Sequence, residues 1–258
     1  MHFTGAEISS IVGTYFWPLV RIAAMITAMP IFSSAFMPIR ARLMFALALT
    51  IIIAPTVPPV PVIDALSFPG MLIVFQQILI GVLMGFIFHL VFAVFTIGGQ
   101  IAAMQMGLGF ATMIDPVNGS QAPVLSMFFV LLVTLLFFVL DGHLAMIGLV
   151  ADSFHSFPIG TDFVERHNFW DMASWGTNMF ASAILVSLPP VTALLLINMS
   201  LGIIGRAAPQ LNIFAVGFSI TIVAGFYVIM TGLPIVLVQF ENVSVSAFDS
   251  VKGFVDMR

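Results

Sequence analysis

The sequence predicts an all-α, membrane-associated protein built from long kinked helices and helical hairpins. Of its 258 residues, 61% are hydrophobic and 7% are charged, whereas a soluble domain carries about 25% charged residues. So few charged side chains cannot cover the surface of a soluble protein, so lipid or neighbouring subunits must cover most of it. The apolar runs are long and continuous, which favours helices over the short alternating strands of a membrane barrel.

Intervals without Asp, Glu, Lys or Arg mark the expected helices, because a membrane-spanning helix needs about 20 apolar residues. A first interval, 8–37, is interrupted by Arg21. The run 70–104 would measure roughly 52 Å as one helix, which exceeds the hydrocarbon core of about 30 Å. Helices of this length suit an assembly of tilted, packed subunits as well as they suit lipid. The uninterrupted intervals are 43–63, 65–114, 116–140, 172–205 and 207–240.

Proline and polar clusters separate the apolar runs. Residues 55–61 contain four prolines and predict a rigid connector outside any helix. Residues 114–120 form a turn cluster, and the pair Pro189-Pro190 should break or kink its helix. Residues 152–171 form the most polar window of the chain, and we expect an exposed loop there.

Small residues and a lone charge predict two packing features. Gly81 and Gly85 are spaced as a face for close helix contact, although glycine is common enough in membrane helices for the spacing to arise by chance. The intervals 172–205 and 207–240 predict a long hydrophobic hairpin. Its expected tip consists of Arg206, Pro209 and Gln210.

Signatures of hydrolytic enzymes are absent from the sequence, which has no cysteine, no His-Glu-x-x-His and no Gly-x-Ser-x-Gly. The lack of cysteine also excludes disulfides and iron–sulfur clusters. Met104, Met106 and Met113 lie near one another, and thioethers can bind Cu(I), but methionine is also a common gap-filler in packing. Packing is the favoured interpretation, and we expect no catalytic residue, cofactor or metal.

Two charged residues, Arg21 and Asp141, lie in apolar runs and are expected to be buried. Buried charges in membrane proteins are candidates for proton relays or ion pairs. A structural pair, or a helix end facing water, is the more ordinary explanation and is favoured here. With His143, the two residues would otherwise form the relay of a proton-coupled secondary transporter, although the internal repeats of many such transporters are not evident.

Residues 98–121 form the most unusual segment, with three glutamines and five glycines between long apolar helices. Non-helical backbone at membrane depth is tolerated only inside protein or along a cavity. A glycine-flanked loop of methionine, leucine and phenylalanine suits a soft hydrophobic constriction, and an ordinary exposed turn is the alternative. The candidate residues are Met106, Gly107, Leu108, Gly109, Phe110, Ala111, Thr112, Met113 and Ile114.

Four patches in this order resemble one protein family across nearly the whole chain. Their central motifs are Pro38-Ile39-Arg40-Ala41-Arg42, Gln105-Met106-Gly107-Leu108-Gly109-Phe110-Ala111, Asp141-Gly142-His143-Leu144 and Arg206-Ala207-Ala208-Pro209-Gln210-Leu211-Asn212-Ile213-Phe214. With these motifs the chain resembles the FliR family, flagellar biosynthetic proteins of the bacterial type III export gate.

The resemblance implies a non-enzymatic gate subunit in the bacterial inner membrane, at the flagellar basal body. It implies a hetero-oligomer with FliP-like and FliQ-like subunits, an associated FlhB-like protein, membrane lipid, unfolded export substrates and no nucleic acid. It further implies a FliP-like half at 1–171, joined to a FliQ-like hairpin and tail at 172–258. Residues 106–121 would plug the channel. A virulence-secretion subunit of the related branch is the alternative, with the same mechanics and a different cargo.

Overall fold

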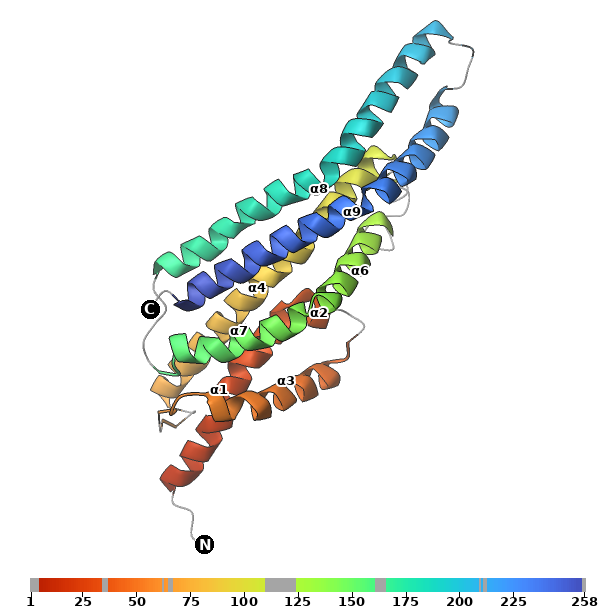
Figure 1. Ribbon diagram of the computed structural model, residues 1–258. Helices are drawn as coiled ribbons and strands as arrows, with labels where there is room; N and C mark the ends of the chain where they lie inside the picture. Colours follow the sequence, from red (N-terminus) through yellow and green to blue (C-terminus); the bar gives the residue numbers. More distant parts are fainter. Residues whose placement is uncertain are drawn as a thin grey trace. The chain divides into compact units, whose positions relative to one another are not determined.

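Helices are the only regular elements in the described part of the chain, which confirms the all-α prediction (Figure 1). The computed structural model describes residues 5–33, 37–61, 63–64, 67–109, 124–160, 166–208, 210 and 213–256. In chain order the elements are α1 (Gly5–Ala28), α2 (Pro30–Ser33), α3 (Ile39–Ile53), the short 3-10 helix η1 (Ala54–Thr56), α4 (Phe68–Gln105), α6 (Val124–Val139), α7 (Gly142–Ser156), α8 (Arg166–Ala207) and α9 (Ile213–Asp256).

Four helical segments of the described residues are long and apolar enough to span a membrane, and a bent pair of helices could supply a fifth span. Each of these five overlaps one of the five uninterrupted apolar intervals, whereas α1, which contains Arg21, is not among them. The four segments are Ile39–Thr56, Phe68–Gln105, Met172–Ala207 and Val216–Phe254, and the bent pair is Val124–Val139 with Gly142–Ser156.

Three helices are longer than a single span requires. α4, α8 and α9 contain 38, 42 and 44 residues, which at about 1.5 Å per residue gives lengths of roughly 57, 63 and 66 Å. Prolines lie inside two of them, at Pro189 and Pro190 in α8 and at Pro234 in α9. The helix assignment of α8 continues through its proline pair, so the predicted interruption is not a complete break.

One connector agrees with the sequence-based prediction and another differs from it. Residues 57–61 are not helical, as the proline run predicts, although Pro55 itself lies in η1. The polar window 152–171 is not one exposed loop, because α7 extends to Ser156 and α8 begins at Arg166. Ser153 and Phe154 are buried in that part of α7, where their helix packs into the core.

The described chain folds into two compact units that each combine distant segments. The first contains Met1–Leu90, Phe138–Gly176 and Ser244–Arg258, and the second contains Val91–Phe137 and Thr177–Val243. These units do not follow the sequence boundary at residue 171. That boundary concerns relatedness to two other kinds of subunit, which compactness does not test, so it stays a prediction.

In the first unit, α1 and α4 pack closely because the residues of α4 at the contact are glycines, which have no side chain. A Cβ added at Gly85 would lie 2.6 Å from the Ala28 Cβ and 2.7 Å from the Met25 carbonyl oxygen, and one at Gly81 would lie 2.9 Å from the Ala24 Cβ. The predicted small-residue face is therefore confirmed. Aromatic pairs add to this core, with ring centroids 5.1 Å apart for Phe88 and Phe248 and 4.8 Å apart for Phe157 and Phe254.

In the second unit, consecutive glycines let two helices approach α4. A Cβ added at Gly98 would lie 3.1 Å from a Val186 methyl group on α8, and one at Gly99 would lie 2.8 Å from the Phe129 ring on α6. The Phe95 ring packs 5.7 Å from the Phe240 ring of α9. The second half of α4 is therefore the centre of this unit, and its C-terminal end leads into the candidate constriction.

Candidate functional site

The end of α4 forms a Schellman motif, which fixes the direction in which the chain enters the 106–121 segment. The Gly107 N–H donates to the Met104 carbonyl and the Leu108 N–H donates to the Ala103 carbonyl, each at 3.0 Å. This pair of bonds needs a left-handed residue at the position of Gly107. Gly107 has φ +83°, a conformation that glycine adopts without steric cost.

The two residues that begin this segment contact α9. Met106 is fully buried, and a Cβ added at Gly225 would lie 2.5 Å from the Met106 Cγ and 2.8 Å from its Sδ and Cε. Gly107 lies under the Phe218 ring, at 3.2 Å for an added Cβ. Met106 is therefore not on the exposed surface of the described chain, and its part in the constriction stays a prediction.

The rest of the candidate constriction is only partly visible. Gly107, Leu108 and Gly109 are half-buried, so the chain becomes more accessible directly after Met106. Phe110, Ala111, Thr112, Met113 and Ile114 lie outside the described residues, and their sealing role stays a prediction.

The expected hairpin tip lies at the end of α8. Arg206 is exposed in the last turn of that helix, and Gln210 is exposed after it, while Pro209 lies outside the described residues. A cation in this position interacts favourably with the carbonyl end of the helix dipole. The sequence-based placement of Arg206 at a water-accessible helix end agrees with this geometry.

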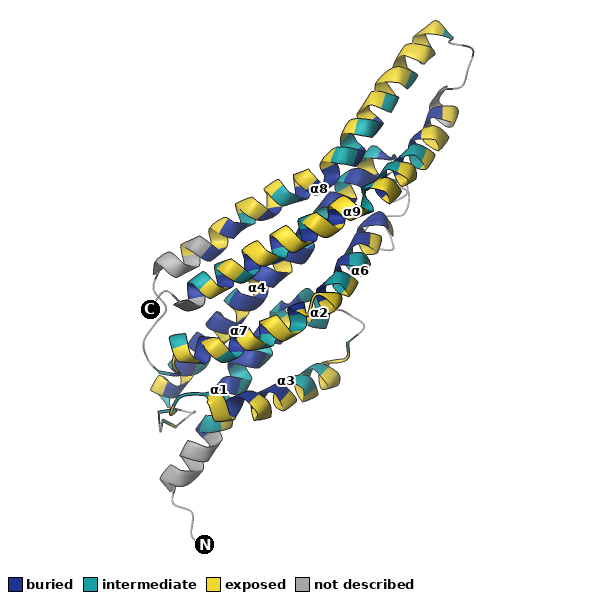
Figure 2. Cartoon of the chain, viewed as in Figure 1, coloured by how far each residue is buried: buried dark blue, intermediate teal, exposed yellow. Residues whose placement is uncertain are grey.

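Many residues of the hairpin formed by α8 and α9 in the second unit are exposed (Figure 2), and many of these are large and apolar. A water-soluble monomer rarely exposes so many large apolar side chains on one hairpin. In α8 these side chains include Phe180, Ile184, Leu185, Leu188, Leu195, Leu196, Met199, Ile203 and Ile204, and in α9 they include Val223, Phe226, Tyr227 and Met230.

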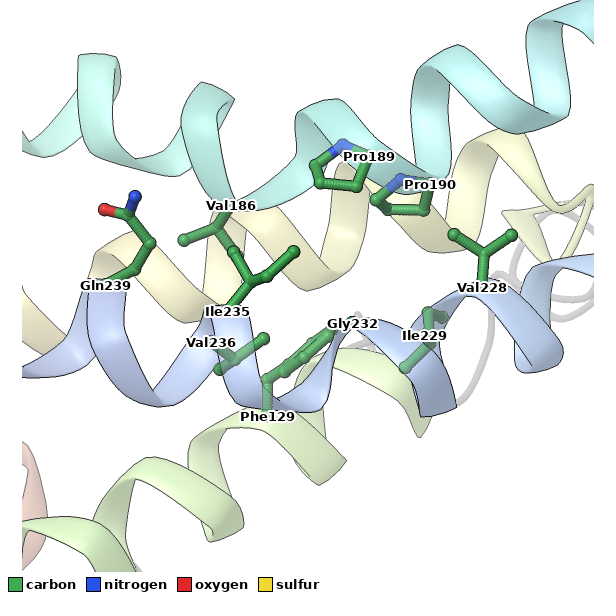
Figure 3. A pocket seen from close by; sticks show the side chains of 10 residues that line it. All are labelled: Phe129, Val186, Pro189, Pro190, Val228, Ile229, Gly232, Ile235, Val236 and Gln239. Carbon is green, nitrogen blue, oxygen red and sulfur yellow. The ribbon is translucent and has the colours of Figure 1, made fainter.

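A small cavity of about 20 Å³ lies between α6, α8 and α9 in the second unit (Figure 3). Its lining includes Pro189, Pro190 and Gly232 together with apolar side chains. A proline inside a helix has no N–H for the preceding turn, and Gly232 presents no side chain that would fill the space. A cavity of this size holds about one water molecule. The cavity is therefore too small for a cofactor.

Arg21 is fully buried in the first unit, as the sequence predicted. Its Nε donates to the Gln77 Oε1 at 2.8 Å, its Nη1 to the Ser153 carbonyl at 2.7 Å and Oγ at 3.1 Å, and its Nη2 to the Phe157 carbonyl at 2.7 Å. The guanidinium carbon also lies 4.2 Å from the centre of the Phe154 ring. The charge therefore joins α1 and α4 to the C-terminal end of α7.

Asp141 is exposed, so the expectation that it is buried was wrong. It occupies a left-handed turn conformation, with φ 54° and ψ 24°, between α6 and α7. That turn places the carboxylate at a chain corner rather than inside a helix. His143 follows in α7, where its ring centroid lies 5.3 Å from that of Phe138.

The sequence did not identify Gln77 as the partner of Arg21 or Gly225 as the residue that contacts Met106. Gln76 and Gln77 interrupt an apolar run, and a buried amide of this kind signals a polar partner. Gly225 is an isolated glycine inside a long apolar helix, which signals a packing requirement. Neither signal identifies the partner, because Arg21 and Met106 lie far away in the sequence.

Comparisons with known proteins agree over nearly the whole chain. Residues 12–246 match the family described as bacterial export proteins, family 1. The chain is 36% identical to the flagellar biosynthetic protein FliR of Escherichia coli, with 96% of this chain and 95% of that protein covered. It is 37% identical to FliR of Pectobacterium carotovorum, with 96% of this chain and 94% of that protein covered. It is 28% identical to FliR of Bacillus subtilis, with 87% of each chain covered. The chain therefore belongs to the FliR family of bacterial export proteins.

Proposed function

We propose that this chain is a subunit of the flagellar type III protein export gate, and that it helps form and seal the channel for unfolded flagellar proteins. Its place would be the bacterial inner membrane, at the flagellar basal body. FliP-like and FliQ-like subunits would surround it in a hetero-oligomer, with an FlhB-like protein associated. The chain would contribute a conduit rather than catalyse a reaction.

The match along the full length to flagellar biosynthetic proteins carries this proposal. Two features of the molecule support it. Four segments of the described chain have the length and composition to cross a membrane, and the α8–α9 hairpin exposes apolar side chains that suit contact with lipid or other subunits. The relatives named above are flagellar proteins, which favours flagellar cargo over virulence cargo.

A proton-coupled transporter receives less support from the geometry. The described hydrogen bonds of Arg21 go to neutral oxygen atoms of Gln77, Ser153 and Phe157. Asp141 is exposed at a corner. A relay requires titratable groups close enough to exchange a proton, and this arrangement does not bring Arg21 and Asp141 together.

The seal would come from the part of the 106–121 segment that follows Gly107. Leu108, Phe110, Met113 and Ile114 supply apolar side chains of different shape. A narrow apolar neck resists wetting because water inside it loses hydrogen bonds. Flexible methionine side chains can still deform around a varied cargo.

Complementation tests the export role directly. Expression of this chain in Escherichia coli cells that lack their own FliR should restore swimming and the secretion of flagellar proteins. Cells with an empty vector give the baseline. Correct insertion of the chain without any restored secretion, in the presence of matching partner subunits from its own source, would contradict the proposal.

A separate measurement tests the seal. The double change Phe110→Ser and Met113→Ser should raise dye uptake in cells that express the whole gate, while copurification of the gate subunits stays normal. Normal impermeability with an intact complex would place the seal on other subunits.

A further inference from the structure

Two arginines, Arg40 and Arg42, lie in the first turn of α3, and the proposed export function gives them no role. Neither side chain forms an ion pair or a hydrogen bond with another described residue, and the buried Nε of Arg42 has no acceptor. The first turn of α3 also contains no acidic residue. A cation at a helix N-terminus opposes the helix dipole, so an anion from outside the described chain would stabilise this end of α3.

The side of α3 below these arginines is apolar. α3 packs on α1, and its buried residues are Ala46, Leu49, Thr50 and Ile53. The Thr50 hydroxyl donates to the Ala46 carbonyl at 2.7 Å, so this polar group is satisfied within the helix. The exposed residues that follow Arg42 are all apolar and recur at helical spacing. They form what we call the α3 face (Figure 2), which consists of Leu43, Met44, Leu47, Ala48, Ile51 and Ile52.

The length of this segment matches a lipid bilayer. Ile39–Thr56 has 18 residues, or roughly 27 Å as a helix, and the hydrocarbon core is about 30 Å thick. The other three candidate spans have 36 to 39 residues, so an upright helix of that length would extend beyond the hydrocarbon. With Ile39–Thr56 in a bilayer, the two arginines lie at the level of the lipid headgroups.

Arg40 lies on the same side of α3 as the apolar face. Met44, Ala48 and Ile52 follow it at intervals of four residues, which places all four on one side of the helix. A long side chain on a helix points toward the N-terminus, so the guanidinium extends from the apolar face into the headgroup layer. Arg42 is half-buried and adds positive charge beside it.

We propose that α3 is a docking site for an anionic phospholipid. The headgroup phosphate binds Arg40, with Arg42 as a second cation, and an acyl chain lies along the α3 face. Guanidinium groups suit this ligand because their donors match the geometry of phosphate oxygens. The inference goes beyond the proposed export function and requires only that α3 lies in a membrane.

Spin labelling tests what covers the α3 face. The chain has no cysteine, so Met44→Cys, at a position that is 70% exposed, gives a single attachment point. The labelled chain is assembled with cysteine-free partner subunits and reconstituted in vesicles of phosphatidylethanolamine and phosphatidylglycerol. We expect frequent collisions of the label with dissolved oxygen and few with a water-soluble nickel chelate, which is the pattern of a position exposed to lipid.

Two other results of this measurement would overturn the proposal. A label that neither oxygen nor the nickel chelate reaches would mean that a partner subunit covers the α3 face. A label that the nickel chelate reaches readily would mean that the face lies in water.

Fluorescence quenching tests the headgroup. A fluorophore replaces the spin label at Met44→Cys, and brominated phosphatidylglycerol or brominated phosphatidylcholine is added at the same mole fraction. We expect phosphatidylglycerol to be enriched about fivefold for each arginine that it engages, since a cation at an anionic membrane surface contributes about that factor. High salt should reduce the preference because ions screen exposed charges. Equal quenching by the two lipids would overturn recognition of an anionic headgroup.

Substitutions assign the preference to Arg40. Arg40→Gln should lower the enrichment of phosphatidylglycerol about fivefold, whereas Arg40→Lys should retain most of it because the charge is kept. Lys252→Gln is the matched control, since Lys252 is an exposed cation of the same unit and Asp249 lies one turn before it on α9. An unchanged preference in Arg40→Gln, or an equal loss in Lys252→Gln, would overturn the proposal. If Arg40→Gln fails to assemble, the comparison of the two lipids and its salt dependence decide the question with both arginines in place.

Failure of the lipid site is distinguishable from failure of the export function, because quenching does not require secretion and can be measured on the chain alone in the same vesicles. Restored swimming with equal quenching by the two lipids would leave the export function standing and show the lipid site to be wrong. A preference for phosphatidylglycerol without restored secretion would leave the lipid site standing and count against export.

Discussion

Arg21 carries a charge into the interior of the first unit without an acidic partner among its described hydrogen bonds. A guanidinium stays protonated in proteins, so its desolvation must be offset by hydrogen bonds and by the Phe154 ring. Two of its acceptors are the Ser153 and Phe157 carbonyls, which belong to the end of α7. The Ser153 carbonyl also accepts the Phe157 N–H, so Arg21 adds a second donor there and supplies a donor to the Phe157 carbonyl just beyond the helix end. Arg21 therefore acts as a C-terminal cap supplied by a distant helix.

Replacing Arg21 tests this cap. Arg21→Met should lower the free energy of unfolding by roughly 2–4 kcal/mol, because the Phe157 carbonyl and the Gln77 Oε1 lose the Arg21 donors. Arg21→Lys should be intermediate, since an ammonium cannot reproduce the planar fork of donors. Thermal unfolding of the detergent-purified complex measures the effect. Arg40→Met is the control at an exposed arginine, with an expected change within about 0.5 kcal/mol.

The sequence predicts the burial of Arg21 but not its acceptors. The partners Gln77 and Ser153 lie 56 and 132 residues away, and only the packing of three helices brings them together. Asp141 shows the opposite failure, because an apolar neighbourhood in sequence predicted burial. A left-handed turn at that residue moved its side chain outside, and hydropathy contains no information about such a turn.

At the scale of the helices, α4 is the element on which both units depend. Glycine pairs at 81 and 85 and at 98 and 99 admit α1, α6 and α8 close to its backbone. Close approach of backbones increases van der Waals contact, which is a main source of helix association where lipid removes the hydrophobic driving force. The length of α4 then places Met106 at its end, next to α9.

A methyl group at Gly85 should separate α1 from α4. Gly85→Ala places its Cβ 2.7 Å from the Met25 carbonyl oxygen, which belongs to the backbone and cannot rotate away. We expect a loss of about 1–3 kcal/mol in stability, measured as a lower unfolding midpoint. Gly148→Ala in α7 meets nothing within 4 Å and should be neutral or slightly stabilising, because alanine favours helices. Equal midpoints for the two variants would contradict the close contact.

The end of α8 gives a second prediction at this scale. Arg206→Glu places a negative charge beside free carbonyls at the helix end, which is unfavourable, whereas Arg206→Lys keeps the cation. We expect impaired assembly and slower swimming with glutamate, and behaviour near wild type with lysine. Swimming diameter and copurification measure the two effects. Wild-type motility of both variants would mean that the tip is a passive turn.

Helix existence is predictable from this sequence because the apolar intervals are long and continuous. Helix ends are less predictable than helix existence. In the polar window 152–171, His155 lies in α7 and Asp171 lies in α8. Tertiary packing of Ser153 and Phe154 extends α7 into this window. The contact between Gly225 and Met106 was unpredictable for a different reason. A glycine in an apolar helix signals close packing without naming the neighbour.

At the scale of the whole molecule, both units expose apolar side chains that water would solvate poorly. Among the most exposed are Ile39 at 77% in the first unit and Val124 at 82% in the second. Burial of apolar area stabilises by about 25 cal/mol per Å², so covering these faces strongly favours association with lipid or protein. The chain is therefore expected to depend on an assembly for its stability.

Coexpression tests this dependence. We expect FliP-like and FliQ-like subunits to raise the yield of this chain several-fold and to give one co-migrating complex in detergent, because the proposed partners would cover apolar faces that otherwise promote aggregation. Expression of an unrelated membrane protein of similar size is the control. A stable, monodisperse monomer whose yield ignores the partner subunits would contradict the prediction.

The burial pattern also determines how the protein responds to peroxide. Met104 is 59% exposed and Met106 is 0% exposed, although only Gln105 separates them, so oxidation should convert the first thioether to a sulfoxide well before the second. Mass spectrometry of the oxidised chain would record that order at natural residues, with buried Met25 and Met29 as internal references. Premature oxidation of Met106 would then report that the end of α4 had left α9. The order in which Met104 and Met106 are oxidised therefore reports on this contact without any substitution in the protein.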